Sequence, residues 1–388
     1  MVVVPRAVVR KVASAGCVLA LGLLAGCTAT SDGTSSPTTS SSAMATGTRP
    51  ASPGATASST GVATRSLTDV VTGLDAPWGI AFLPSGDAVV TLRDQKRLVL
   101  VNADGKIRKV DGPGADQLVD LVEPGGEGGL LGVAVLDATG DEADIALYAT
   151  TADDNRVLRA TLSGTSLGTV RPILTGIRKA GNHDGGQVAV GPDGFLYVTT
   201  GDAGHGADAQ DEDSLNGKIL RLTFDGDPAP GNPFGTAVWT LGHRNVQGIG
   251  WAPDGRMFAA EFGQNTWDEL NLIEPGSNYG WPDVEGQAGT DGFVDPLRQW
   301  ATSDASPSGL AVTDDAVYLA ALRGERLWRV PLNPDGVGEP QALLVGELGR
   351  LRAVAPAPDG SLWVLTNNTD GRGTPRAGDD RIARVDIS

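Results

Sequence analysis

The sequence predicts an all-β protein, a six-bladed β-propeller preceded by a signal peptide and a disordered tether. Three observations lead to this prediction. Short strand-like phrases recur along the chain from residue 66 onward. No stretch shows the sustained 3.6-residue apolar period with capping residues that indicates helices. The first 64 residues, finally, differ in composition from all the rest of the chain.

The first recurring phrase is a short apolar run, a tight turn and a second apolar run. Proline fixes φ at the first corner of the turn, and Asp or Ser with Gly completes it, so each copy predicts a β-hairpin. Four clear copies read AFLPSGDAVVTL (81–92), VAVGPDGFLYVTT (188–200), IGWAPDGRMFAAE (249–261) and VAPAPDGSLWVLT (354–366). Two looser copies occupy 133–151 and 310–322.

A second phrase follows each of these hairpins, and it alternates polar and apolar residues as half-buried strands do. Its copies are KRLVLVNADG, NRVLRATLSG, GKILRLTFDG, DELNLIEPG, ERLWRVPLNPDG and DRIARVDIS. Six pairs of phrases, about 45–60 residues apart, predict six four-stranded units, which is typical of a propeller. A strand near Ser66–Val71 should complete the last blade and close the ring. An array of β-sandwiches is the alternative.

The chain begins with the pattern of a signal peptide over residues 1–26. Arg6, Arg10 and Lys11 form a positive segment, and the apolar stretch from Val12 to Leu24 is short for a membrane span. The sequence therefore predicts export from the cell. A short transmembrane anchor remains the alternative.

Cys27 follows Leu24-Ala25-Gly26, and small residues before a cysteine resemble the bacterial lipobox. We therefore expect Cys27 to be lipidated and to anchor the protein at the outer face of the cell membrane; an ordinary cleavage site nearby is the alternative. Residues 27–64 are rich in Ser, Thr, Ala, Gly and Pro, which predicts a disordered linker. The propeller domain is then expected over residues 65–388.

Charge and cysteine content exclude several classes of protein. The net charge of −17 argues against a nucleic-acid surface, since phosphate binding needs clustered Lys and Arg. Of the two cysteines, Cys17 lies in the segment that a signal peptidase would remove. The mature chain would keep only Cys27, so neither a disulfide nor a cysteine-based metal site is expected.

His183 and Asp202 are candidates for a catalytic pair. Asp202 follows His183 by nineteen residues, and a predicted hairpin lies between them. A hairpin returns the chain to the end where it started, so the two side chains should meet. A carboxylate beside an imidazole fixes its tautomer and raises its basicity, as a general base requires. Two polar loop residues facing water are the alternative.

Several arginines could converge on the axis of a propeller. Arg244 stands beside Asn245 at the entrance to a strand, and Arg350 and Arg352, two residues apart, share one face of a strand. Together with Arg323 they suggest an anionic ligand within an acidic domain. For Arg244, a position on a solvated loop is the alternative.

The segment 261–286 could contribute to a calcium site. Glu261, Asp268 and Glu269 offer carboxylate oxygens, and the backbone near Gly263 offers carbonyl oxygens. Acidic loop residues are, however, more often only solvated.

These segments together resemble the soluble glucose/sorbosone dehydrogenase family, the pyrroloquinoline-quinone (PQQ)-dependent aldose dehydrogenases. The resemblance covers nearly all of residues 66–388. It rests on APWGIAF, GGEGGLLGVAV, NHDGGQVAVGPDGFLYVTTGD, LNGKILRL, LGHRNVQGI, EFGQNTWDELNLI, GSNYGWP, LRGERLWRV and GRLRAVAPAPDG. The family fold is a six-bladed propeller, in agreement with the repeat count.

The resemblance implies a role for each matching position. His183 would be the general base that takes the proton of the anomeric hydroxyl, and Asp202 would orient it. Calcium would be held by backbone carbonyls at Gly263 and Gln264. The expected PQQ-binding side chains are Glu127, Arg244, Asn245, Trp300, Thr302, Arg323, Arg350 and Arg352.

Five positions depart from the family pattern. Gln187 replaces an Arg, Phe262 a Gln and Gln264 a Pro. Glu127 stands where the sugar enzyme has Gln, and Arg323 where it has Lys. These differences do not affect the predicted fold. They concern the affinity for the cofactor and the choice of sugar substrate.

The leading hypothesis is a PQQ- and calcium-dependent dehydrogenase that oxidises an aldose to its lactone and passes electrons to a quinone or redox protein. The membrane would be contacted through the lipid anchor only. A non-catalytic propeller lipoprotein that binds a glycan or an envelope partner is the alternative. A calcium-dependent lactonase is a third possibility.

Overall fold

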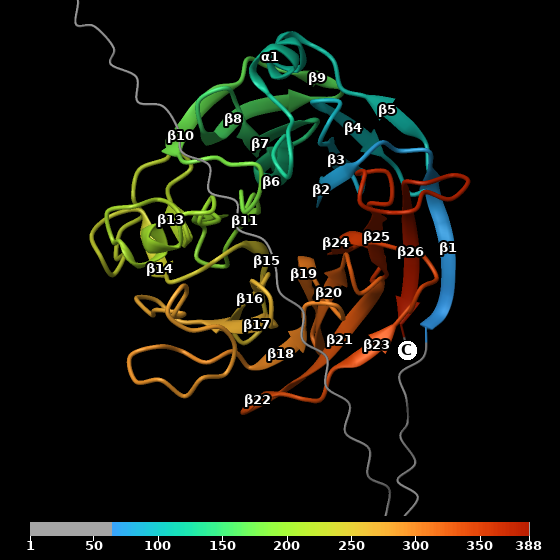
Figure 1. Ribbon diagram of the computed structural model, residues 1–388. Coiled ribbons are helices and arrows are strands. Elements are labelled where there is room, and N and C mark those ends of the chain that lie inside the picture. The colour runs from blue at the N-terminus through green and yellow to red at the C-terminus, as the bar shows by residue number, and fades with distance from the viewer. Residues whose placement is uncertain (1–63, 388) are drawn as a thin grey trace, which may run out of the picture. The chain divides into compact units, whose positions relative to one another are not determined.

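The computed structural model describes residues 64–387, and they form a β-propeller of six blades arranged in a ring (Figure 1). The predicted signal peptide, Cys27 and nearly all of the tether lie outside the described residues. The fold class predicted from the repeats is confirmed.

In the first three blades each copy of the first phrase forms the inner hairpin, and each second phrase forms the third strand. Blade 1 contains β2 (Pro77–Phe82), β3 (Ala88–Leu92), β4 (Arg97–Val101) and β5 (Ile107–Lys109). Blade 2 contains β6 (Leu130–Thr139), β7 (Glu142–Thr150), β8 (Asn155–Ser163) and β10 (Arg171–Ile177), with β9 (Ser166–Leu167) paired to β8. Blade 3 contains β11 (Val188–Val190), β12 (Leu196–Thr199), β13 (Lys218–Leu222) and β14 (Val238–Leu241).

The other three blades repeat this order. Blade 4 contains β15 (Val246–Trp251), β16 (Met257–Glu261), β17 (Trp267–Ile273) and β18 (Arg298–Ala301). Blade 5 contains β19 (Pro307–Val312), β20 (Ala316–Ala321) and β21 (Arg326–Asn333), whose partners are β22 (Gly336–Val337) and β23 (Gln341–Leu343). Blade 6 contains β24 (Leu351–Pro356), β25 (Leu362–Thr366), β26 (Arg381–Ile387) and β1 (Thr64–Thr72).

The two ends of the propeller sequence share blade 6. β1 pairs antiparallel with β26, with Leu67 opposite Val385. The predicted closing strand near Ser66–Val71 therefore exists, and it starts at Thr64, one residue before the predicted domain boundary. Pairing the first strand with the last removes the open edges that a linear array of sheets would leave.

The apolar core lies in the seams between neighbouring blades. Six clusters of buried side chains fill these seams, one for each pair of adjacent blades. In the seam between blades 1 and 2, for example, Leu98 and Leu100 pack with Ile145 and Leu147. The strands are buried on both faces, which explains why their apolar runs are nearly continuous.

Two short helices were not predicted. α1 (Pro113–Leu121) carries proline in its first turn and buries Ala115 and Leu118 against blades 1 and 2. Its nine residues are too few to show a sustained helical period in the sequence. The other is a 3₁₀ helix, η1 (Gly206–Gln210). No helix within residues 64–387 is long and apolar enough to cross a lipid bilayer.

Candidate active site

One end of the ring collects the loops that enter each innermost strand and leave each second strand. These two strands are antiparallel neighbours, so both loops reach the same rim. His183 lies just before β11, and Asp202 lies just after β12, with Val188 opposite Val198 between them. The hairpin argument from the sequence is therefore correct for this pair.

The imidazole of His183 is fixed by the carboxylate of Asp202. Nδ1 of His183 lies 2.7 Å from Oδ1 of Asp202, and both side chains are largely buried. Asp202 also accepts hydrogen bonds from the N–H of Gly204 at 2.8 Å and from Nε1 of Trp281 at 2.8 Å. Burial by itself raises the pKa of Asp202, but the bonds from His183, Gly204 and Trp281 outweigh it and hold that pKa below its ordinary value.

Arg244 and Asn182 face the other ring nitrogen and settle the tautomer of His183. Nη2 of Arg244 lies 2.7 Å from Nε2 of His183, and Nδ2 of Asn182 lies 3.3 Å from it. A guanidinium can only donate hydrogen bonds, so Nε2 must accept and the ring proton sits on Nδ1, toward Asp202. The unprotonated Nε2 belongs to a side chain that lines a cavity, which is the arrangement a general base needs.

The backbone of His183 is held in a strained conformation. Its φ is 57°, in the left-handed region that side chains other than glycine rarely adopt. The N–H of His183 donates to Oε2 of Glu127 at 2.9 Å, and its carbonyl accepts from the N–H of Ala203 at 3.2 Å. A Cβ on Gly201 would stand 1.8 Å from the same carbonyl oxygen, so only glycine allows this close approach.

Arg244 is positioned by a second histidine–carboxylate pair. Its backbone N–H donates to Glu261, and Oε2 of Glu261 lies 2.9 Å from Nδ1 of His243. Its Nε donates to the side-chain oxygen of Gln264 at 2.9 Å. Burial lowers the pKa of Arg244, and the surrounding carboxylates, Asp202 first among them, oppose that effect.

His183 opens on a polar cavity of about 660 Å³, within the range of roughly 300–1,000 Å³ typical of small-molecule sites. Its lining brings together side chains from loops of several blades. The residues predicted for the site that line it are Glu127, His183, Arg244, Asn245, Gly263, Gln264, Thr302, Arg323 and Arg350.

Three predicted residues do not line this cavity. Asp202 lies behind His183. Trp300, on β18, packs in the core against Trp328, with ring centroids 5.6 Å apart. Arg352 is buried deeper along the axis, where it donates to Gln247, Ser308 and Asn367 and stands over the ring of Trp78. Their roles toward a ligand stay predictions.

The arginines that line the cavity differ in whether a carboxylate of the protein already pairs with them. Arg350 donates to Oδ2 of Asp370 at 3.1 Å, and Asp370 is almost fully buried. Arg372, from the loop after β25, forms an ion pair with Glu127 at 3.0 Å. Arg323 has no ion-pair partner within residues 64–387. The cavity thus presents guanidinium groups to an anionic ligand.

The opposite wall is formed by the loop after β16. It places Gly263 and Gln264 on the cavity, and Asp268, the second residue of β17, lines the same cavity. Both carboxylate oxygens of Asp268 are occupied, by the N–H of Gly263 at 2.9 Å and the N–H of Ser306 at 2.6 Å. Burial raises the pKa of Asp268 to about 6. Within the described residues, no three His, Cys, Asp or Glu side chains cluster as metal ligands.

Two of the three carboxylates suggested by the sequence as calcium ligands, those of Glu261 and Glu269, form hydrogen bonds with other groups of the protein. Glu261 holds Arg244 and His243. Glu269 is buried beside Glu261, accepts from Gly286 and Asn271, and has its pKa raised by burial and by the charge of Glu261. Whether Asp268 contacts a cation stays a prediction.

Sequence reasoning gave no role to Trp281, Asp370, Arg372 or Glu285. Trp281 stands in the quoted segment GSNYGWP, and its neighbour Pro282 follows a cis peptide bond. That aromatic segment was the only available signal. Arg372 and Asp370 lie in a polar loop of ordinary composition, and nothing in the sequence distinguishes them from solvated residues.

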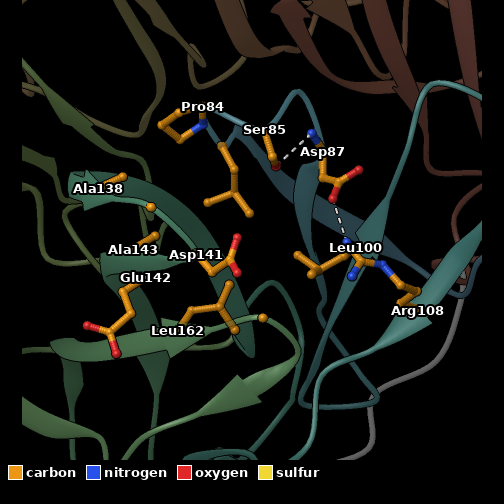
Figure 2. Close-up of a pocket in the computed structure, with 13 residues that line it drawn as sticks. Pro84, Ser85, Asp87, Leu100, Arg108, Ala138, Asp141, Glu142, Ala143 and Leu162 are labelled. Carbon is orange, nitrogen blue, oxygen red and sulfur yellow. Dashed lines mark hydrogen bonds and ion pairs between the residues drawn. The ribbon is translucent and has the colours of Figure 1, made fainter.

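A smaller hollow of about 130 Å³ lies between blades 1 and 2 (Figure 2). Ser85 and Asp87 border it from the β2–β3 turn, and Asp141 from the β6–β7 turn. These turns are at the end of the blades opposite His183. The residues that line this hollow include no histidine that could act as a base. We therefore place the active site at the arginine-lined cavity, which contains His183.

The comparison with known proteins agrees with the fold. A family model described as Glucose / Sorbosone dehydrogenase matches residues 74–374. The chain belongs to the glucose/sorbosone dehydrogenase family. Aldose sugar dehydrogenase YliI of Escherichia coli is 30% identical over 339 residues, which cover 77% of this chain and 89% of that protein.

Other proteins match over similar lengths. An uncharacterised protein of Synechocystis, slr1608, is 31% identical over 352 residues, covering 78% of this chain and 84% of that one. The PQQ-bound structure of aldose sugar dehydrogenase from Streptomyces coelicolor shares 49% sequence identity, with a TM-score of 0.79 over 84% of this chain and 98% of that chain.

Proposed function

We propose that this protein is a PQQ-dependent dehydrogenase that oxidises an aldose at its anomeric carbon to the lactone. One observation carries the proposal. The unprotonated Nε2 of His183 belongs to a cavity-lining side chain, while Nδ1 is held by Asp202 at 2.7 Å and guanidinium groups surround the same cavity. Membership in the family and the PQQ-bound relative support it.

The residues present fit the cofactor. PQQ is a flat, tricyclic ortho-quinone with three carboxylates, and Arg323 and Arg350 on the cavity wall would hold two of these carboxylates. Asn245 uses its side-chain oxygen to accept from the N–H of Gly185 at 3.0 Å, which leaves its amide NH₂ for a quinone oxygen. The carbonyl oxygens of Gly263 and Gln264 would hold Ca²⁺, a cation that prefers oxygen ligands.

PQQ, when bound, supplies the acceptor for the hydride of the sugar C–H bond. The protein handles the proton. A sugar hydroxyl that reaches Nε2 replaces the hydrogen bond from Arg244 and gives its proton to that nitrogen. The imidazolium that results is stabilised by the charge of Asp202 on its other side. The buried position of Asp202 strengthens this interaction because water does not screen it.

We also propose that the protein is exported and held at the outer face of the cell membrane by lipid on Cys27. The sequence of residues 1–27 is the support for this placement. A quinone or redox protein in the same compartment would then receive the electrons. The variant Cys27→Ser should move the protein from the membrane fraction to the soluble fraction, and an unchanged membrane fraction would contradict the anchor.

A quinone titration tests the enzymatic proposal. Purified protein in calcium buffer is titrated with PQQ while absorbance and heat are followed, and dye reduction is then measured with a panel of aldoses. We expect saturable PQQ binding and sugar-dependent dye reduction. Protein that binds no quinone and oxidises no aldose would refute the proposal. Glycan binding alone would instead favour a non-catalytic propeller, and hydrolysis of sugar lactones with calcium alone a lactonase.

A further inference from the structure

Four consecutive backbone N–H groups converge on a single oxygen of Glu285. Three belong to the loop after β16 and the fourth to Trp267, the first residue of β17. Their nitrogens lie 2.7, 3.2, 3.1 and 3.1 Å from Oε1 of Glu285 for residues 264, 265, 266 and 267 in that order. Successive N–H groups turned to one side form a concave anion site. Here the anion is a side chain of the protein itself, from the loop that follows β17.

This arrangement dictates where the carbonyl groups of the loop point. In a planar trans peptide the C=O of one residue and the N–H of the next point in opposite directions. Neither the bond between Gly263 and Gln264 nor that between Gln264 and Asn265 is cis. Because the N–H groups of Gln264 and Asn265 face Glu285, the carbonyls of Gly263 and Gln264 must face away from it.

The active-site cavity lies on the side of the loop away from Glu285. Gly263, Gln264 and Asn265 all line that cavity and Glu285 does not; of these three loop residues, only Gly263 also borders the separate small hollow that Glu285 lines. No group within residues 64–387 donates a hydrogen bond to the carbonyl oxygen of Gly263 or Gln264. Both oxygens therefore remain available for a ligand.

Gly263 makes the tight curve of this loop possible. A Cβ there would stand 1.8 Å from the carbonyl oxygen of Trp267 and 2.6 Å from Oε1 of Glu285. The loop and the carboxylate thus occupy the space that any side chain at this position would need, so the curve and the glycine depend on each other.

We propose that Glu285 is a positioning residue for a divalent cation, because its carboxylate turns the carbonyl oxygens of Gly263 and Gln264 into the cavity. This inference rests on the calcium site of the proposed function and names the residue that builds it. It also gives a physical reason for glutamine rather than proline at position 264. The N–H of Gln264 makes the shortest of the four bonds, at 2.7 Å, and a proline in its place would have no N–H to donate.

Calcium affinity measured on a series of variants tests this inference. The full-length apoprotein is titrated with Ca²⁺ by calorimetry, and with Tb³⁺ by luminescence, for wild type, Glu285→Leu and Glu285→Gln. Glu339→Gln is the matched control, since that side chain is 92% exposed, pairs with Arg298 and does not line the cavity. Circular dichroism confirms that each variant is folded.

We expect Glu285→Leu to weaken Ca²⁺ binding by roughly 10–100-fold, as the loss of outer-shell support does in other metal sites. Glu285→Gln keeps an acceptor oxygen but loses the charge, so it should weaken binding several-fold, and Glu339→Gln should match wild type. In the PQQ-loaded protein, saturating calcium should restore the sugar oxidation rate of the Glu285 variants, which a general folding defect would not allow.

The outcomes separate this inference from the proposed function. If the Glu285 variants keep wild-type calcium affinity while PQQ binding and sugar oxidation persist, the positioning role is overturned and the dehydrogenase stands. If wild type binds PQQ but no calcium, the positioning role and the calcium site are both overturned. If Glu285→Leu does not fold, the Glu285→Gln variant alone tests the positioning role. A calcium affinity of Glu285→Gln equal to that of wild type would then overturn that role.

Discussion

Two histidine–carboxylate pairs are connected through Arg244 in this protein, and of their two imidazoles only that of His183 lines the active-site cavity. His183 and Asp202 are joined at 2.7 Å, and His243 and Glu261 at 2.9 Å, each through Nδ1. The difference lies at Nε2. That of His243 is bonded to Oγ1 of Thr240 at 2.8 Å, and its ring stacks on Tyr279 with no exposure to solvent.

The comparison teaches that a carboxylate beside an imidazole does not by itself make a base. An imidazole can act as a base only if a substrate can reach its second nitrogen. Of these two histidines, only His183 lines a cavity from which a substrate could do so. Arg244 joins the two pairs, since its backbone N–H is held by Glu261 while its guanidinium reaches His183. The buried pair, His243 and Glu261, therefore holds Arg244 in the position from which it contacts His183.

The largest expected effect is the loss of the cavity-facing imidazole. His183→Ala should lower sugar-dependent dye reduction by roughly 10²–10⁴-fold, the usual contribution of a general base. The free energy of unfolding should fall only modestly, because Asp202 keeps its hydrogen bonds from Gly204 and Trp281. Steady-state kinetics of the PQQ-loaded protein and urea unfolding measure the two quantities. A variant that retains more than a tenth of the activity would refute the base assignment.

Removing the buried imidazole should act on stability first. His243→Leu leaves the carboxylate of Glu261 buried without its partner, and we expect a loss of about 3 kcal/mol in the free energy of unfolding. Urea unfolding of His243→Leu beside His183→Ala measures the contrast. Equal stability of the two variants would show that the pairs do not differ as described.

A buried carboxyl next to His183 gives a prediction about pH. Burial raises the pKa of Asp184 to about 6, and its Oδ2 has no partner within the described residues, in contrast to the fully bonded Asp202. In the unfolded chain its pKa is about 3.9, so the folded protein binds the extra proton between about pH 4 and pH 6. This contribution to stability is present below about pH 4 and is lost as the pH rises through 6.

Asp184→Asn removes that titration. The variant should gain up to about 3 kcal/mol over wild type above pH 6.5, and the gain should fade below pH 5. Urea unfolding at a series of pH values gives the difference between the two proteins. A difference that stays constant with pH would show that Asp184 does not titrate in this range.

The smallest effect is expected at the rim of the cavity. Arg372 is about half exposed and pairs with Glu127, which in turn holds the N–H of His183. Arg372→Ala should change stability by less than about 1 kcal/mol, since exposed ion pairs contribute little. We expect KM for the sugar to rise several-fold while kcat stays near wild type. A fall in kcat with an unchanged KM would instead connect Arg372 to the chemical step.

Much of the fold and part of the site could be predicted from local patterns. The turn chemistry of the hairpins gave the six blades, and the strand-like segment at residue 66 gave the closure. His183 and Asp202 meet because one hairpin, a local structure, separates them. The α1 helix escaped prediction because nine residues buried at Ala115 and Leu118 produce no lasting period.

The residues that sequence patterns missed lie far from their partners along the chain. Arg372 and Glu127 are 245 residues apart, and Trp281 and Asp202 are 79 apart. Glu285 belongs to a loop with no repeat, and nothing local distinguishes it from the other acidic residues of the chain. Trp300 and Thr302, two residues apart on one segment, fall in different places, since only Thr302 lines the cavity.

The sequence alone determined the number of blades, their order and the hairpin that joins an imidazole to a carboxylate, because strands and tight turns are set by neighbouring residues. The tertiary structure alone decided which loops share the cavity, which histidine lines it and which acid turns the carbonyls of the loop after β16. Closing the ring brings the loops of six blades to one rim, and those contacts depend on the whole circle rather than on any segment of it.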